Sequence, residues 1–282
     1  MKTSINAWSI PAEYDFEQTF KKAAELGFEC IELNLDAETD PSKHAFHYDS
    51  DESLYKEVRE LSKKYNVKTT SVSTSLYWGV GAFGADDEKK RDEALRVLRK
   101  QIEIAKGIGA TAILCVPCVD AETGLKKSFE NTIKVFRSLK KEIKKGGVEI
   151  GLENVWNGFF MSPFDVKMLL DKIDNKMVGI YFDVGNMVEF SDPLYWTEIV
   201  APYIKRIHIK DFKRNNGACY NGGTFCKLLE GDVDFEKVIP MIKASGYDFT
   251  ATSEVFPSPE EDVDEFLTRL SKDVKTIVDM AK

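Results

Sequence analysis

The run VEIGLENV at residues 148–155 shows the architecture of the chain most clearly, because a short β-rich segment there ends on an acidic residue, Glu153. In a parallel barrel the carboxyl ends of the strands meet at one mouth, where active sites are built. Three later runs have the same form: VGIYFDVGN at 178–186, IKRIHIKD at 204–211 and FTATSEVF at 249–256. Their candidate metal ligands are Asp183, His208 and Glu254. We therefore expect four residues that are distant in sequence to converge.

Strand-like segments alternate with amphipathic stretches along the whole chain. The last stretch is the clearest, since Phe266, Leu270 and Val274 follow the spacing of one helix face. Glycines end several such stretches just before the next strand, as in AKGIGAT at 105–111. Eight such units predict an α/β chain folded as a single (β/α)8 TIM barrel. The predicted strands are 4–8, 30–35, 67–73, 112–116, 148–153, 178–183, 204–209 and 249–255.

The alternation of strand-like and helix-like segments continues without a break, and this indicates the domain organisation. An open doubly wound sheet is the alternative fold, but the glycine-rich loop that would follow its first strand is missing. The sequence contains no linker, low-complexity tract or shift in composition. We therefore expect residues 1–282 to form one domain.

Composition and charge exclude several classes of partner. The formal net charge is −8, whereas a nucleic-acid-binding chain normally carries a basic stripe. No apolar run approaches the 18 or so residues of a membrane span. The N-terminal MKTSINAWSI lacks the apolar core of a secretory signal, and five cysteines are an odd number. We expect a cytoplasmic protein with reduced thiols that binds neither nucleic acid nor membrane.

The candidate ligands comprise three carboxylates and one imidazole. This donor set suits a divalent cation such as Mn²⁺, Mg²⁺, Co²⁺ or Zn²⁺. Such an ion can chelate adjacent carbonyl and hydroxyl oxygens of a sugar, and it stabilises the enediolate formed when an α-proton leaves. The sequence therefore predicts one divalent metal ion, with the ligands Glu153, Asp183, His208 and Glu254.

Glu153 and Glu254 are also the predicted catalytic pair. They end the fifth and eighth predicted strands, so in an eight-stranded barrel they would lie on nearly opposite sides of the centre. Two opposed carboxylates can remove a proton from one face of a carbon atom and return a proton to the other face. That geometry suits epimerisation, whereas an aldose–ketose isomerase transfers a proton along one face and could use one base.

Short motifs in a fixed order resemble the sugar phosphate isomerase/epimerase family of xylose isomerase-like TIM barrels. That family includes ketose 3-epimerases and ketopentose-phosphate 3-epimerases. The resemblance covers essentially the whole chain, and its specificity comes from the order and spacing of the motifs. These motifs are GFECIEL, GLENVW, YFDVGN, IHIKDF, LEGDVDF and SEVF.

The resemblance implies roles for particular residues. In the 3-epimerases the matching Glu, Asp, His and Glu bind one divalent metal, often manganese, and the two glutamates are the acid/base pair. An arginine six residues after the metal histidine contacts substrate oxygens there, and Arg214 has that offset from His208. Free-ketose epimerases carry a substrate-binding histidine three residues after the metal aspartate, where this chain has Asn186. This departure favours a sugar phosphate over a free sugar.

Further substrate contacts are expected at other strand ends. Trp8, Trp78 and Trp156 fall at or just after the first, third and fifth strands, and aromatic faces stack on the apolar face of a sugar. Packing at the top of the barrel is the alternative role for each. Ser73 ends the third strand beside Thr74, where hydroxyl groups could hold a phosphate. A homo-oligomer is compatible with the sequence.

Other activities of the same barrel remain as alternatives. An inosose dehydratase-like lyase or a hydroxypyruvate isomerase would use the same metal and one glutamate. An endonuclease IV-like DNA hydrolase needs several histidines for a three-zinc cluster. This chain has three histidines in all and a negative net charge, which disfavours that activity. The function predicted first is C3 epimerisation of a ketose or ketose phosphate through a cis-enediolate.

Overall fold

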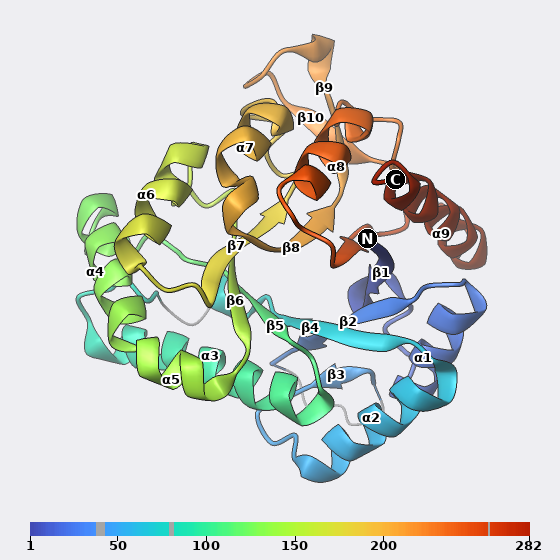
Figure 1. Ribbon diagram of the computed structural model, residues 1–282, viewed down its shortest axis with the longest axis horizontal. Coiled ribbons are helices and arrows are strands. Elements are labelled where there is room, and N and C mark those ends of the chain that lie inside the picture. Colours follow the sequence, from blue (N-terminus) through green and yellow to red (C-terminus); the bar gives the residue numbers. More distant parts are fainter. Residues whose placement is uncertain (38–42, 79–81, 259) are drawn as a thin grey trace.

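The computed structural model describes residues 1–37, 43–78, 82–258 and 260–282 (Figure 1). Its main sheet closes into a barrel of parallel strands, because β1 pairs with both β2 and β11. This is the TIM barrel that the sequence predicts. The barrel strands, in the order in which they pair, are β1 (Lys2–Asn6), β2 (Cys30–Leu35), β4 (Lys68–Ser73), β5 (Ala112–Cys115), β6 (Glu149–Glu153), β7 (Val178–Asp183), β8 (Ile204–Ile209) and β11 (Thr250–Ser253).

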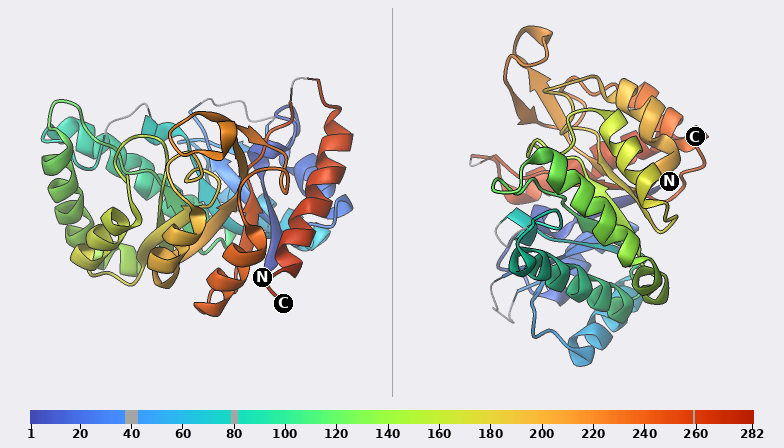
Figure 2. Two further views of the ribbon diagram at one scale, coloured as in Figure 1. Left: turned by 90° about the horizontal axis from the view of Figure 1, so that it is seen from above. Right: turned by 90° about the vertical axis from the view of Figure 1, so that its left-hand side faces the viewer.

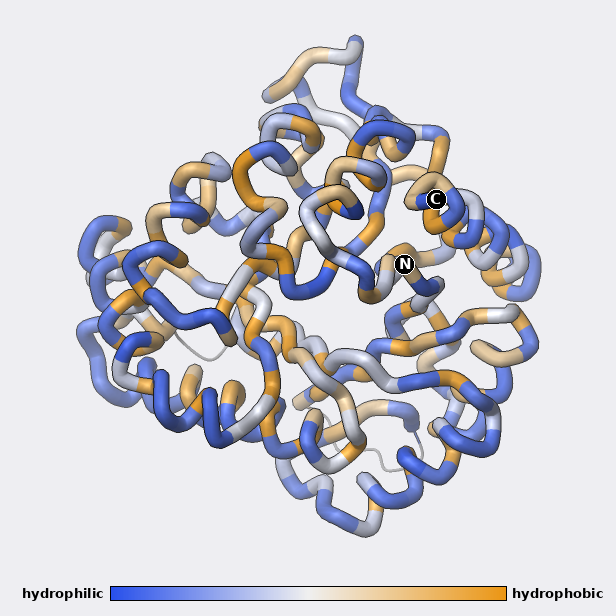
Figure 3. The backbone as a smooth tube through the Cα atoms, in the orientation of Figure 1, coloured by the Kyte–Doolittle hydropathy of each residue, from blue (hydrophilic) through white to orange (hydrophobic). Residues whose placement is uncertain are grey.

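Helices surround the barrel on its outside (Figures 1 and 2). In α9 the buried residues include Phe266, Leu270 and Val274, which is the face expected from their spacing. Hydrophilic and hydrophobic residues alternate along the outer helices (Figure 3). The helices are α1 (Phe16–Glu25), α2 (Glu52–Tyr65), α3 (Glu88–Ile108), α4 (Leu125–Ser138), α5 (Lys140–Gly146), α6 (Pro163–Ile173), α7 (Pro193–Val200), α8 (Phe235–Ala244) and α9 (Val263–Asp279). None of the helices in the described part of the chain has the length and apolar character needed to span a bilayer.

The strand ends that carry the candidate site are close to their predicted positions. β2, β7 and β8 begin and end at the predicted residues, and β11 ends one residue before Glu254. β1 differs, because it ends at Asn6 rather than at Trp8. The Asn6 side chain accepts a hydrogen bond from the Trp8 backbone N–H and caps a short 3₁₀ helix, η1 (Ala7–Ser9). Three more 3₁₀ turns are η2 (Leu76–Trp78), η3 (Ala201–Tyr203) and η4 (Asn215–Gly217).

An antiparallel hairpin follows β8, which is the seventh barrel strand along the chain. It consists of β9 (Asp211–Arg214) and β10 (Gly223–Cys226), and it projects beyond the helices at the top of Figure 1. The buried Asp211 carboxylate fixes its base by accepting hydrogen bonds from the backbone N–H groups of Gly231 and Val233. In the predicted loop after the second strand, β3 (Ala45–Phe46) pairs with β2, and residues 38–42 lie outside the described residues.

The barrel interior beneath the mouth is polar. TIM barrel interiors are usually filled by bulky branched side chains. Here Ser71 of β4 and Tyr181 of β7 both hydrogen-bond to the fully buried Glu32 of β2, although β7 is not a neighbour of β2 in the sheet. Asn6 of β1 also donates to Glu32, at 2.7 Å. Since buried polar groups are costly unless they are hydrogen-bonded, this network positions Glu32 at the centre of the barrel.

Candidate metal centre and active site

Four side chains from consecutive barrel strands meet at the mouth. They come from the ends of β6, β7 and β8 and from the residue after β11. Each offers one ligand atom, and these atoms lie within 4.8 Å of one another. Four donors around an ion at about 2.1 Å would be separated by comparable distances. The cluster consists of Glu153, Asp183, His208 and Glu254.

The hydrogen bonding around this cluster fits a divalent cation. Oδ1 of Asp183 accepts hydrogen bonds from the backbone N–H groups of Gly185 and Asn186, each at 2.9 Å. Oδ2 of Asp183 is buried and has no hydrogen bond of good geometry among the described residues, although Lys210 Nζ is 3.1 Å away. A buried carboxylate oxygen in this position is suited to bind a metal ion. Asp183 therefore has one oxygen fixed by the backbone and one directed at the cluster.

Glu32, on the side of His208 that faces away from the cluster, holds the imidazole in one orientation. Its Nε2 lies 2.6 Å from Oε1 of Glu32, and the imidazole N–H donates to that carboxylate. Its Nδ1 lies 3.2 Å from Glu153 Oε1 and 3.1 Å from Glu254 Oε2. With the proton on Nε2, the Nδ1 lone pair faces two carboxylate oxygens, an arrangement that a shared cation would stabilise. A carboxylate behind a metal-binding histidine fixes its tautomer and increases its basicity as a ligand.

The two glutamates occupy different electrostatic environments. Burial, together with the charge of Glu254, raises the pKa of Glu153 above its ordinary value against the opposing effect of His208. Burial acts in the same direction on Glu254, but the charges of Lys210 and His208 outweigh it and lower the pKa of Glu254. Pairs of carboxyl groups whose pKa values are pushed apart are typical of acid/base catalysis.

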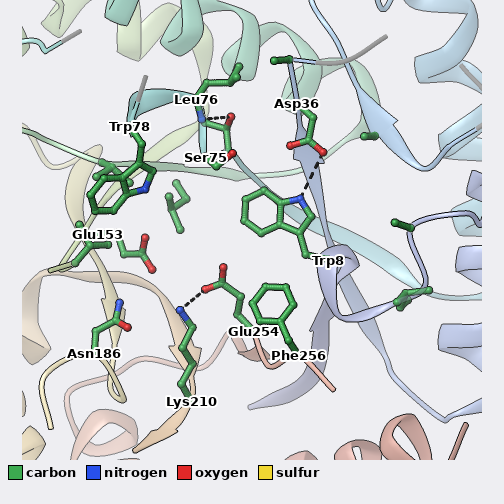
Figure 4. Close-up of a pocket in the computed structure, with 18 of the residues that line it drawn as sticks. Trp8, Asp36, Ser75, Leu76, Trp78, Glu153, Asn186, Lys210, Glu254 and Phe256 are labelled. Carbon is green, nitrogen blue, oxygen red and sulfur yellow. Dashed lines mark hydrogen bonds and ion pairs between the residues drawn. The ribbon is translucent and has the colours of Figure 1, made fainter. Parts of the chain in front are cut away.

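A cavity of about 790 Å³ lies above the cluster, and Glu153, Asn186, Lys210 and Glu254 line it (Figure 4). Its walls carry several large aromatic side chains. Trp156 stacks on Phe225 of β10 with ring centroids 5.3 Å apart, so the hairpin contributes to the wall. Polar groups at the floor and aromatic faces at the sides are what a sugar-binding cavity needs. The aromatic lining residues are Trp8, Trp78, Trp156, Phe225 and Phe256.

The structure brings Trp8, Trp156 and Asn186, three of the predicted substrate-binding residues, to this cavity, and Trp78 lines it as well. Trp8 lines it and lies with Nε1 3.5 Å from Asp36 Oδ2. Trp156 lines it, remains 46% exposed, and donates from Nε1 to the Asn186 carbonyl oxygen at 2.6 Å. Asn186 lines it and donates from Nδ2 to the Asn154 carbonyl oxygen.

Ser73 and Arg214 lie elsewhere. Ser73 is buried in the barrel interior, where its hydroxyl is hydrogen-bonded to the Asn34 side chain, and it is not among the residues that line the cavity. The neighbouring Thr74 and Ser75 line it instead. The Arg214 guanidinium donates to the backbone carbonyl oxygens of residues 188 and 191, at 2.5 and 2.7 Å. In this structure its side chain joins the hairpin to the segment after β7.

Sequence reasoning did not select Glu32 or Lys210. Glu32 stands in GFECIEL, within a strand whose other residues are buried, and a lone acidic residue in such a strand is the signal that could have revealed it. Lys210 follows His208 by two positions, which places both on the same face of the strand.

The barrel and its carboxylate–histidine cluster define the class of the chain. A family model described as xylose isomerase-like TIM barrel matches residues 20–272, and the chain belongs to this family. One relative, L-ribulose-5-phosphate 3-epimerase UlaE from Escherichia coli (strain K12), is 23% identical over 247 residues, which are 85% of this chain and 81% of the relative.

Solved structures show the same fold. A structure of L-ribulose 3-epimerase matches with a TM-score of 0.78 and 14% identity over 99% of this chain and 95% of that one. The IOLI protein with a bound zinc atom matches with a TM-score of 0.80 and 18% identity over 100% of this chain and 99% of that one. UlaE and the solved L-ribulose 3-epimerase are named as epimerases, and the chain is a member of this isomerase-class enzyme family.

Proposed function

We propose that this chain is a divalent-metal-dependent epimerase that inverts C3 of a ketose or ketose phosphate. The observation that carries the proposal is the relation between Glu153 and Glu254. They stand on β6 and after β11, with β7 and β8 between them in the barrel, and both line the cavity. Two carboxylates on different sides of one substrate carbon are what a two-base epimerisation requires.

In the proposed mechanism one glutamate removes the C3 proton and the other supplies a proton to the opposite face. The C–H electron pair forms the C2–C3 double bond, and the carbonyl π pair moves to O2, giving a cis-enediolate. Reprotonation of C3 from the other side returns the pair and inverts the centre. A divalent ion held by Glu153, Asp183, His208 and Glu254 would supply Lewis acidity toward the carbonyl group of the substrate. The aromatic walls and Asn186 hold the sugar between the two glutamates.

The substrate class follows from the relatives and the cavity together. One relative is named for L-ribulose 5-phosphate and one solved neighbour for L-ribulose, which supports a five-carbon ketulose as the first substrate to test. For a phosphorylated substrate, Ser75 and Lys43 are lining residues with suitable chemistry. Arg214 is engaged by backbone carbonyl groups, so a role for it in binding substrate stays a prediction.

The function is tested by incubating the protein, loaded with Mn²⁺, with pentuloses and hexuloses in deuterium oxide. L-Ribulose and L-ribulose 5-phosphate are the first pair. Proton and carbon NMR should show the C3 epimer with one solvent deuteron at C3 and an unchanged carbon skeleton. Loss of water would instead identify a dehydratase. Formation of an aldose with deuterium at C2 would identify an aldose–ketose isomerase, and either result would overturn the proposal.

The two-base assignment is tested with Glu153→Gln and Glu254→Gln. General acid–base groups contribute roughly 10²- to 10⁴-fold to rate, so each variant should lose at least that factor in kcat. Bound metal is quantified in every variant, because both residues are also candidate ligands. Glu230→Gln, an exposed position on the loop after the hairpin, is the control and should keep wild-type activity. A metal-loaded Glu254→Gln protein with near wild-type turnover would refute the two-base mechanism.

A further inference from the structure

Lys210 is a half-buried cation at the edge of the candidate metal centre. It follows β8, and its Nζ lies 2.7 Å from Glu254 Oε2 and 3.1 Å from Asp183 Oδ2. Its side chain is 17% exposed and lines the cavity, and Figure 4 shows it reaching from the barrel toward Glu254. The ammonium therefore contacts two of the four candidate ligands and also faces the space where a substrate binds.

The surroundings of Lys210 are built to hold its stem in this position. A Cβ atom at Gly185 would lie 2.5 Å from the Cβ of Lys210, so the absence of a side chain at Gly185 makes room for the lysine. On the other side Nζ lies 5.9 Å from the ring centroid of Phe225, which is also a wall of the cavity. Both contacts limit the directions in which the ammonium can point.

The charges of the site require a cation here. The carboxylates of Glu32, Glu153 and Glu254 lie within 3.2 Å of the His208 ring nitrogens, and Asp183 belongs to the same cluster. A divalent ion balances two of these four charges, and Lys210 balances a third. When the enediolate forms, negative charge moves from the glutamate that takes the proton to a sugar oxygen, which is costly in a low-dielectric site unless a cation lies beside that oxygen. An ammonium group has three N–H donors, and the close contacts with Asp183 Oδ2 and Glu254 Oε2 use at most two of them.

We propose that Lys210 is a further catalytic residue, whose third N–H donates a hydrogen bond to the sugar oxygen that becomes negatively charged when C3 is deprotonated. This inference rests on the proposed function. When a glutamate takes the C3 proton, the C–H pair becomes the C2–C3 double bond and the carbonyl π pair moves to O2. Lys210 stabilises that oxygen and keeps its own protons. Only the two glutamates exchange protons with C3.

The test compares Lys210→Met and Lys210→Arg with Lys213→Met in the Mn²⁺-loaded protein. Methionine keeps the approximate length of the stem and removes the charge. Lys213 is 56% exposed on β9 and pairs with Asp232, so its substitution serves as a control that should change kcat less than twofold. Loss of one preorganised donor to an oxyanion lowers kcat about 10²- to 10³-fold. We expect that loss in Lys210→Met, a smaller loss in Lys210→Arg, and one bound metal ion in both variants at saturating Mn²⁺.

A second measurement does not depend on turnover. A short polyhydroxy hydroxamate carries two adjacent oxygens with the geometry of a cis-enediolate, and its affinity for each Mn²⁺-loaded protein can be measured by calorimetry. Lys210→Met should bind it at least tenfold more weakly than wild type, with Lys213→Met unchanged. If Lys210→Met keeps wild-type kcat and hydroxamate affinity, or if excess Mn²⁺ restores both, Lys210 only balances charge and the inference fails.

The two proposals fail in different ways. A wild-type protein that epimerises none of the ketoses, free or phosphorylated, contradicts the proposed function. An active wild-type protein whose Lys210→Met variant is equally active contradicts the role of Lys210 alone.

Discussion

Glu32 and His208 contact each other across the interior of the barrel, with His208 Nε2 2.6 Å from Glu32 Oε1. They stand on β2 and β8, which are separated in the sheet by β1 and β11. Glu32 also accepts hydrogen bonds from Asn6, Ser71 and Tyr181. The carboxylate is therefore fully satisfied, and its position determines where His208 Nδ1 points.

Replacing Glu32 should weaken the metal centre without removing any of its ligands. Mutation of a carboxylate that supports a metal-bound histidine typically lowers metal affinity by about 10- to 100-fold. In Glu32→Gln the new amide N–H₂ group would face the hydrogen-bond donors of Asn6, Ser71 and Tyr181. We therefore expect the Mn²⁺ affinity to decrease by about 10- to 100-fold. Calorimetric titration with Mn²⁺ measures it. Glu29→Gln, at an exposed position just before the same strand, is the matched control, and equal affinities in both variants would show that Glu32 does not support the metal site.

Metal binding should also stabilise the fold, since the cluster joins four strands. An ion that binds only the native state at 100 times its dissociation constant adds about 2.7 kcal/mol to the free energy of unfolding. We expect urea unfolding midpoints to rise when Mn²⁺ replaces a chelator. Asp183→Asn removes one ligand charge and should abolish most of that increment. An increment of wild-type size in Asp183→Asn would mean that the stabilising ion binds at another place.

The sequence predicted the strand ends well, and with them the convergence of the four candidate ligands. Strand periodicity and the shared direction of parallel strands are enough for that inference, as for Asp183 at the end of β7 and His208 within β8. Contacts between distant strands are different. The partner of Glu32 lies 176 residues away in sequence, and nothing local in GFECIEL specifies it.

Loop geometry was the other feature that the sequence did not predict. No strand was predicted between residues 209 and 249, but residues 211–226 contain the β9–β10 hairpin, which brings Phe225 into the cavity wall. The spacing of Arg214 from His208 suggested a substrate contact. In the structure its guanidinium donates to backbone carbonyl groups of the segment after β7, and its role in substrate binding stays a prediction. Direction within a loop depends on backbone angles that residue spacing does not determine.

The aromatic wall should affect substrate binding more than chemistry. Trp156 is a partly exposed ring that lines the cavity, and its N–H donates to the Asn186 carbonyl oxygen. Aromatic contacts contribute about 0.5–1.5 kcal/mol beyond the burial of area, so Trp156→Ala should raise KM by at least roughly two- to tenfold. Trp156→Phe keeps a ring and should recover part of that loss. Steady-state kinetics separate KM from kcat, and a change confined to kcat would contradict a binding role.

Protonation of His44 should destabilise the protein below neutral pH. This side chain is buried, with Nδ1 2.9 Å from the Tyr14 carbonyl oxygen, and burial lowers the pKa of His44 below its ordinary value of about 6.5. Because the unfolded chain then binds a proton more readily than the native state, the contribution of His44 to the free energy of unfolding is fully present above about pH 6.5 and is lost as the pH falls below that value.

His44→Asn places an amide nitrogen near the position of Nδ1 and does not titrate. In the presence of a chelator, which removes the linkage to metal binding, the free energy of unfolding of wild type should fall more steeply between about pH 6.5 and 5 than that of His44→Asn. His47→Asn, at a less buried position in the same segment, should follow the wild-type curve, and parallel curves for wild type and His44→Asn would exclude His44 as the source.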